Sequence, residues 1–462
     1  MGVFRKFPRT FWVANTIELF ERWAWYGFFM LFANYLTGSS DMGGLEFTQS
    51  QKGILMGVGT GILYFLPVLT GAIADRYGYK KVLALAFVIY TSAFIFLPMF
   101  STFTGVFLMY LYLALGAALF KPIISATIAK TTTDETASIG FGIYYMMVNI
   151  GAFFGPMFYV SAGIIALNFV LLLFYKEPHR GVVQQTSLTR TFGDIFRNMF
   201  SIVKDLKFVV FLLIVAGFWT MYNQLFFTLP VFISQWIDTS VLYHFFEKYI
   251  PFISTNYSPA PGVMDAEFVT NFDALYIIIF QIIVSSVVMR MKPLKSMISG
   301  FLVCSIGMAL TLFSQNVLFT LVAILIFSLG EMAGSPKITE YIGRIAPHDK
   351  KALYMGYSFI PVFIGNVFAG IISGVVYQNM ADKVMITRQF VAEKGLHLPD
   401  GLSNNAYFEH VAQQVNLTPH ELTNLLWNEY SPSNIWMVIL AIGLGTTLLL
   451  YIYDRVINKT KR

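Results

Sequence analysis

Three charged residues, Glu18, Glu21 and Arg22, lie inside the first long apolar stretch of this chain. Each costs roughly a few kcal/mol or more at bilayer depth unless it is paired or hydrated. At helical spacing they share one face with Trp25. A carboxylate that can become neutral, beside a cation that cannot, is what a proton relay needs. A structural ion pair is the alternative, but two acids for one base leave a group free to titrate.

The composition indicates a membrane protein. The 462 residues are 56% hydrophobic and only 12% charged, which is about half the charge of a typical globular domain. Apolar stretches long enough to span hydrocarbon recur along the chain, so we expect a polytopic, all-α membrane protein. No cleavable signal peptide is apparent, because the first apolar run is too long and retains its charges. The lone Cys304 excludes an internal disulfide and a thiolate metal cluster.

The net charge of +6 is explained by its placement and predicts no nucleic-acid partner. Basic residues gather near the N-terminus, around Lys80, in the stretch 176–207, around Lys292 and Lys350, and in the last eight residues. These segments alternate with apolar spans as cytoplasmic loops do. We therefore expect a multi-pass protein of the cell membrane with both termini in the cytoplasm.

The apolar pattern predicts twelve transmembrane helices in two six-helix bundles. The first bundle covers 1–175, a basic linker covers 176–207, and the second bundle covers 208–462; within the linker, 188–204 could form an amphipathic surface helix. Such a halving is typical of transporters built around a central site. The spans are expected at 11–36, 51–74, 82–100, 103–129, 138–158, 160–175, 208–234, 273–290, 294–314, 316–342, 352–377 and 433–453.

Three regions depart from a simple alternation of spans and short loops. Residues 138–175 are almost continuously apolar, and the inside placement of later basic loops requires two spans there; the turn between them is very tight, or the chain lacks residues. The segment 235–272 is expected as an outward, irregular loop with a short amphipathic piece. The outward segment 378–432 should contain a helix opened by Thr418 and should be dispensable for coupling.

The loop between the second and third spans carries a strong motif, Gly71-Ala-Ile-Ala-Asp75-Arg76-Tyr-Gly78-Tyr-Lys80-Lys81. It resembles the signature loop of the major facilitator superfamily. Glycines allow close helix approach, and Asp75 could cap the next helix or its neighbour. The resemblance implies the major facilitator fold and assigns Asp75 and Arg76 to gating rather than to substrate binding.

An ordered set of further motifs resembles the proton-dependent oligopeptide transporter (POT) family. The motifs touch both halves of the chain and are Glu18-Leu-Phe-Glu21-Arg22 with Trp25-Tyr26-Gly27, Leu115-Gly-Ala-Ala-Leu-Phe-Lys121-Pro122, Phe141-Gly-Ile-Tyr144-Tyr145-Met-Met-Val-Asn149-Ile-Gly151, Gly330-Glu331-Met-Ala-Gly-Ser335-Pro336 and Gly365-Asn366-Val-Phe-Ala-Gly370. The resemblance implies that Glu18, Glu21 and Arg22 couple protons. Glu21 is expected to be the principal coupling residue, because it shares a helix turn with Arg22 and can exchange between an ionised, paired state and a neutral one. The resemblance also implies that Lys121 and Arg22 receive a peptide carboxylate and that Glu331 receives the ammonium. The remaining substrate-binding candidates are Tyr26, Tyr64, Asn149, Trp219 and Ser335.

Structural alternatives exist for several of these residues. Lys121 could snorkel to the cytoplasmic face, and Glu331 could be a packing residue bonded to Ser335. Tyr64 and Trp219 could simply pack. The chain also departs from the family, because span seven carries Asn223-Gln224 and no acid, and Trp25 replaces a tyrosine.

The expected function is symport of a proton with a di- or tripeptide by alternating access, driven by the proton gradient without a cofactor or metal, in a monomer. One alternative is proton-coupled transport of another small anionic or zwitterionic solute. The other is a non-transporting receptor or scaffold. The retained intramembrane charges argue against it, because a scaffold would gain stability by losing them. An ATP-driven pump or an enzyme is disfavoured, because the chain has no GxxxxGK[ST] loop and no HExxH motif.

Overall fold

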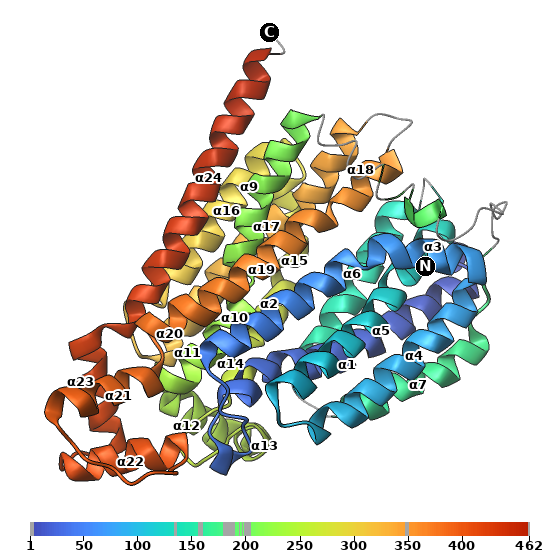
Figure 1. Cartoon of the computed structure of the whole chain (residues 1–462). Helices are drawn as coiled ribbons and strands as arrows, with labels where there is room; N and C mark the ends of the chain where they lie inside the picture. The colour runs from blue at the N-terminus through green and yellow to red at the C-terminus, as the bar shows by residue number, and fades with distance from the viewer. Residues whose placement is uncertain are drawn as a thin grey trace.

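A computed structural model describes residues 4–133, 136–155, 160–178, 190–193, 195, 197, 205–346 and 351–460. The regular elements among these residues are helices, arranged as two bundles side by side (Figure 1). Both chain ends lie on the side that carries α3 and α18, which we call the terminal side. Helices α12, α13, α21, α22 and α23 cover the opposite, distal side.

The N-terminal bundle begins with a short 3₁₀ turn at Phe4–Lys6 and contains seven helices. They are α1 (Arg9–Thr37), α2 (Gln49–Phe65), α3 (Pro67–Tyr77), α4 (Tyr79–Phe96), α5 (Phe103–Lys130), α6 (Ala137–Phe154) and α7 (Ser161–Phe174). Two of these helices begin at a capping threonine. The hydroxyls of Thr48 and Thr102 accept hydrogen bonds from backbone N–H groups in the first turns of α2 and α5.

The C-terminal bundle contains longer and shorter helices in alternation. They are α9 (Leu206–Tyr222), α10 (Gln224–Phe227), α11 (Leu229–Trp236), α12 (Ser240–Tyr249), α13 (Pro251–Asn256), α14 (Ala266–Thr270), α15 (Phe272–Val288), α16 (Pro293–Leu310), α17 (Val317–Ile345), α18 (Lys351–Tyr357), α19 (Phe359–Ile371), α20 (Tyr377–Met380), α21 (Lys383–Lys394), α22 (Asn404–Gln414), α23 (Pro419–Tyr430) and α24 (Ile435–Thr460). A π-helix at Ile372–Val376 joins α19 to α20.

The described residues contain eight helical segments long and apolar enough to cross a membrane, or nine if α2 and α3 form one bent span. The chain is therefore a multi-pass membrane protein. Helices occupy the positions of the other three predicted spans, but α1 carries the charged cluster, and the apolar parts of α6 and α7 are shorter. The total of twelve spans stays a prediction.

Several spans are broken where the sequence pattern was read as continuous. The second span bends by 41° between α2 and α3, where Pro67 cannot donate the backbone bond that a straight helix needs. The seventh span breaks at Asn223 and again at Thr228. The eleventh breaks at Ser358 and continues through the π-helix. Such breaks occur in membranes where backbone lines a cavity or packs against protein.

Two outward segments are more ordered than expected. The segment 235–272, expected as a largely irregular loop, contains α12, α13 and α14, and the eighth span begins at Ala266 rather than at residue 273. The helix expected after Thr418 is confirmed as α23, with a capping box between Thr418 and Glu421. Most of the linker, including most of the predicted amphipathic helix 188–204, lies outside the described residues.

Candidate functional site: a charged cavity between the bundles

The acidic cluster of α1 is held by one arginine. Arg22 Nε and Nη2 donate to both carboxylate oxygens of Glu21 at 2.5 and 2.6 Å, and Nε lies 3.3 Å from Glu18 Oε1. The Tyr90 hydroxyl of α4 also donates to Glu21. Glu18, Glu21 and Arg22 are all buried, as helical spacing predicted.

The two carboxylates have unequal environments. Glu21 is fully buried, and Arg22 and Tyr90 together bond both of its oxygens. Glu18 retains one buried oxygen, Oε2, without a hydrogen-bond partner. A carboxylate with an unsatisfied buried oxygen is easier to protonate than one that accepts several charge-assisted bonds. The geometry therefore makes Glu18 the more exchangeable of the two acids.

A cavity of about 280 Å³ lies between the two bundles, beside this cluster. Four of the predicted binding residues line it: Tyr26, Tyr64, Trp219 and Ser335. The other lining residues are Trp25, Phe29, Thr60, Tyr222, Asn223, Phe226, Ile338, Thr339, Ser358, Phe359 and Val362. Helices α1 and α2 supply one wall, and α9, α10, α17 and α19 supply the other.

The N-terminal wall of the cavity is backed by two cations. The Arg22 guanidinium lies 5.9 Å from the centre of the Tyr26 ring. The Lys121 ammonium lies 4.0 Å from the centre of the Tyr64 ring, a distance typical of a cation–π contact. Both rings line the cavity, so each cation stands directly behind an aromatic face of this wall.

The C-terminal wall is backed by a carboxylate. Glu331 is 6% exposed, and its Oε1 accepts a 2.9 Å bond from the hydroxyl of Tyr222, a cavity-lining residue. Its other oxygen, Oε2, is buried and has no hydrogen-bond partner. Glu331 thus bonds to Tyr222 rather than to Ser335, the partner that a packing role suggested.

Two further candidates differ in their placement. Trp219 lines the cavity, and its buried indole N–H has no hydrogen-bond partner. Asn149 is buried on α6 and donates to the Tyr145 carbonyl of its own helix at 2.8 Å. It does not belong to the cavity lining.

The predicted gating pair lies on the terminal side, at the junction of α3 and α4. Asp75 accepts a 2.9 Å bond from the Tyr79 hydroxyl, and Arg76 lies near the ring of Tyr77. Asp75 does not cap α4; the N–H of Tyr79 donates instead to Glu177, at 2.8 Å. Gly78, at φ 103°, makes the turn between the helices in a conformation that side-chain-bearing residues rarely adopt.

The bundles touch closely on the distal half of α2. A Cβ on Gly53 would lie 2.2 Å from the carbonyl oxygen of Gly370 on α19. One residue earlier, the fully buried Lys52 donates a 2.8 Å bond to the Phe227 carbonyl at the break in the seventh span. Gln49 donates to Asp382 at 3.1 Å. These contacts join the two bundles on the distal side of the cavity, and we call them the distal closure.

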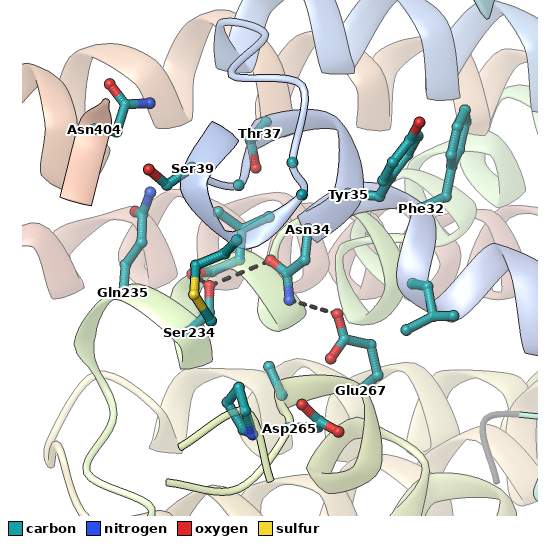
Figure 2. A pocket seen from close by; sticks show the side chains of 18 of the residues that line it. Phe32, Asn34, Tyr35, Thr37, Ser39, Ser234, Gln235, Asp265, Glu267 and Asn404 are labelled. Atoms are coloured by element: carbon teal, nitrogen blue, oxygen red, sulfur yellow. Dashed lines mark hydrogen bonds between the residues drawn. The ribbon is translucent and has the colours of Figure 1, made fainter. Parts of the chain in front are cut away.

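Beyond this closure lies a larger vestibule of about 920 Å³, lined by both bundles and by α21 and α22 (Figure 2). Asn34 of α1 projects into it and donates to Glu267 of α14 at 2.7 Å, while Ser234 donates to Asn34 at 3.2 Å. Asp265 lies beside Glu267, and burial raises the pKa of the Asp265 carboxyl to about 6.

The family model described as the Major Facilitator Superfamily matches residues 15–242. An uncharacterized MFS-type transporter of Bacillus subtilis (strain 168), YqjV, is 22% identical over 348 residues, which are 71% of this chain and 77% of that protein. The N-terminal half of the chain is thus similar to the Major Facilitator Superfamily. Dipeptide and tripeptide permease A of Edwardsiella piscicida is 29% identical to this chain over 160 residues, which cover 33% of the chain and 31% of the permease.

Solved structures show the same fold. A POT family transporter in complex with 5-aminolevulinic acid superposes with a TM-score of 0.70 at 16% identity, covering 97% of both chains. A POT family transporter in complex with a thioalcohol-conjugated peptide gives a TM-score of 0.70 at 15% identity, covering 98% of this chain and 99% of that chain. The nucleoside transporter NupG (D323A mutant) gives 0.63 at 13% identity, covering 96% and 99%. These likenesses establish the major facilitator fold of the chain.

The structure adds site residues that the sequence analysis missed. Tyr222 and Phe226 line the cavity, and Asp273 is a further buried acid of the C-terminal bundle. Asp273 escaped notice because a charge at the start of an apolar run looks like an interfacial residue. The sequence signal was the apolar content of α14, which extends the eighth span beyond Asp273 and so places this acid inside the span.

Proposed function

We propose that this protein is a proton-coupled symporter of the POT family that imports di- or tripeptides by alternating access. The observation that carries the proposal is the charge arrangement of the central cavity. Arg22 and Lys121 back one wall, and Glu331 backs the other, with no cation of the described residues paired to it. A zwitterion that bridges the walls has each charge met by its opposite and draws the bundles together.

Cavity size and lining support a small substrate recognised through its termini. The volume of about 280 Å³ is near the lower limit of small-molecule sites, roughly 300 Å³. Aromatic rings of Tyr26, Tyr64 and Trp219 offer apolar contact to varied side chains. The partial likeness to a dipeptide and tripeptide permease agrees with this assignment.

Proton coupling is assigned to the α1 cluster of Glu18, Glu21 and Arg22. We assign the exchangeable proton to Glu18, because its Oε2 has no partner. When Glu18 is neutral, Arg22 stays paired to Glu21, so the cluster carries no net charge and can cross between the two states of the transporter. The terminal side, with Asp75 and Arg76 as gate residues, is assigned to the cytoplasm, and the unit of function to the monomer.

A second candidate function is proton-coupled transport of a different small anionic or zwitterionic solute. One observation favours it. The similar structure that holds 5-aminolevulinic acid shows that this fold accommodates a small amino acid that is not a peptide. The two candidates differ in whether a peptide backbone is required.

Competition in a counterflow assay tests the assignment. Unlabelled dialanine, N-acetyl-dialanine and 5-aminolevulinic acid would compete with labelled dialanine in proteoliposomes. Glu331→Gln should weaken the binding of free dialanine by about 1–3 kcal/mol, as expected for the loss of a charge-assisted hydrogen bond. It should barely affect the binding of the acetylated analogue. Glu340→Gln, on the same helix but paired with Lys337 and Arg344, is the matched control. Equal weakening of free and acetylated peptides by Glu331→Gln would remove Glu331 from this role, and wild-type indifference to a free amino group would favour the second candidate.

A further inference from the structure

Asp273, the second residue of α15, is buried in the C-terminal bundle and is bonded to the turn of α17 that leads to Glu331. Its side chain is 5% exposed, and Oδ1 accepts a 2.5 Å hydrogen bond from the Ser328 hydroxyl of α17. Ser328 precedes Glu331 by three residues, so the two share one face of α17. The two carboxyl groups are close enough to interact electrostatically.

The groups that surround this pair are acids or neutral side chains. Those that face it are the phenols of Tyr26 on α1, Tyr145 on α6 and Tyr222 on α9, and the Cys304 thiol on α16. On α14, which leads into α15, the ionisable side chain is Glu267, another acid, bonded to Asn34. Among the described residues, no Lys, Arg or His forms an ion pair with Asp273 or Glu331.

The two bundles therefore differ in the charge that they bury around the cavity. Beside the cavity, the N-terminal bundle holds Glu18 and Glu21 against Arg22 and Lys121, which balances to zero; its other buried cation, Lys52, lies on the distal side. Beside the cavity, the C-terminal bundle holds Asp273 and Glu331, and no cation of the described residues is paired with them. Two adjacent buried carboxylates cannot both stay ionised without a counter-charge, so the pair retains a proton.

We propose that Asp273 and Glu331 share one proton and form a second proton site of the transporter, in the C-terminal bundle. With the cavity empty, the proton is distributed between the two carboxyls. When a substrate ammonium pairs with ionised Glu331, the proton resides on Asp273, whose neutral form keeps the bundle free of net charge. Ser328 is a positioning residue that holds Asp273 toward Glu331. This inference rests on the proposed binding of an ammonium group by Glu331.

Infrared difference spectroscopy of the purified protein tests the shared proton without transport. A pH titration of the wild type should show a protonated carboxyl signal persisting to neutral pH. Asp273→Asn should remove that signal or move its titration to lower pH by at least one unit, because the remaining Glu331 no longer has a like charge beside it. Asp400→Asn, an exposed aspartate of the distal side, should leave the signal unchanged. The same titration in Asp273→Asn and wild type would overturn the proposal.

Two further measurements separate this inference from the proposed function. In proteoliposomes, Asp273→Asn should retain dialanine counterflow but lose at least half of the gradient-driven accumulation. Ser328→Ala should shift the pH profile of uptake to higher pH, because it removes a hydrogen bond that favours ionised Asp273. Accumulation equal to wild type by Asp273→Asn would overturn the second proton site while leaving peptide symport intact. If wild type transports no peptide, the infrared titration still decides whether the pair shares a proton. Should Asp273→Asn fail to fold, Ser328→Ala in the infrared titration takes its place, and an unshifted signal there counts against the proposal.

Discussion

Asn34 on α1 and Glu267 on α14 are joined by a 2.7 Å hydrogen bond across the two bundles, at the inner edge of the distal vestibule (Figure 2). Glu267 is 6% exposed, so this bond satisfies a carboxylate that is nearly removed from solvent. Asn34 also donates to the Pro230 carbonyl at 3.3 Å, which ties the same side chain to the broken seventh span. A single amide thus links the N-terminal bundle to two elements of the C-terminal bundle.

Asn34→Ala should weaken the distal closure. The variant leaves Glu267 buried without its partner, which costs about 1–2 kcal/mol in the closed state, a factor of roughly 5–30 in the open population. The measurement is the rate of labelling of a cysteine placed at Thr37 in the vestibule. Thr387→Ala, whose hydroxyl bonds only to the backbone of its own helix, is the control. A labelling rate that both variants leave unchanged would show that Asn34 does not hold the closure.

Gly53→Ala should prevent the bundles from closing on the distal side. The added methyl would lie 2.2 Å from the Gly370 carbonyl oxygen, which is backbone and cannot move aside cheaply. We expect the distance between spin labels on the distal ends of α2 and α19 to lengthen. Gly142→Ala, where nothing lies within 4 Å, should keep the wild-type distance distribution. A wild-type distribution in Gly53→Ala would contradict the packing of α2 on α19.

Glu18→Gln and Glu21→Gln should have separable effects. Glu18→Gln removes the exchangeable proton, so it should abolish gradient-driven accumulation and keep counterflow. Glu21→Gln also breaks a buried pair with Arg22 that has two hydrogen bonds. It should therefore lower the free energy of unfolding as well, by about 3–5 kcal/mol. Melting curves and uptake on the same preparations check this. Full accumulation by Glu18→Gln would return the coupling role to Glu21.

Asp265→Asn should stabilise the protein at neutral pH but not in acid. Burial raises the pKa of this carboxyl from 3.8 to about 6, so folding favours its neutral form. The stability that this shift contributes is complete below pH 3.8 and is lost as the pH rises through 6. Because the side chain is only partly buried, we expect a gain of about 1 kcal/mol at pH 7.5. Melting temperatures at pH 4 and pH 7.5 measure this gain in stability, and Asp400→Asn is the exposed control. A gain of equal size at both pH values would contradict the assigned pKa shift of Asp265.

The charged positions could be predicted from sequence because the free-energy cost of a charge inside a membrane makes it conspicuous in an apolar run. Glu18, Glu21 and Arg22 lie on one buried face of α1, as their spacing predicted. Tyr26 and Tyr64, which the resemblance assigns to substrate binding, line the cavity, and their binding role stays a prediction. These features depend on local helical geometry or on motifs that name single residues.

Contacts between distant segments could not be predicted in this way. Lys52 stands at the start of an apolar run and reads as an interfacial lysine, yet it is fully buried against the backbone of Phe227. The segment 378–432 contacts the N-terminal bundle as well as its own, because Gln49 donates to Asp382 and the N–H of Asn404 donates to Glu46. Its dispensability for coupling stays a prediction. Only the tertiary arrangement places these partners together.

The most direct test of the account is uptake of labelled dialanine into proteoliposomes with and without an inward proton gradient. We expect accumulation above the external concentration only when the gradient is present, and its collapse on addition of a protonophore. Counterflow of dialanine should continue without the gradient, because exchange needs no net proton movement. Accumulation that does not depend on the gradient, or the absence of dialanine transport by inserted, folded protein, would contradict proton-coupled peptide symport.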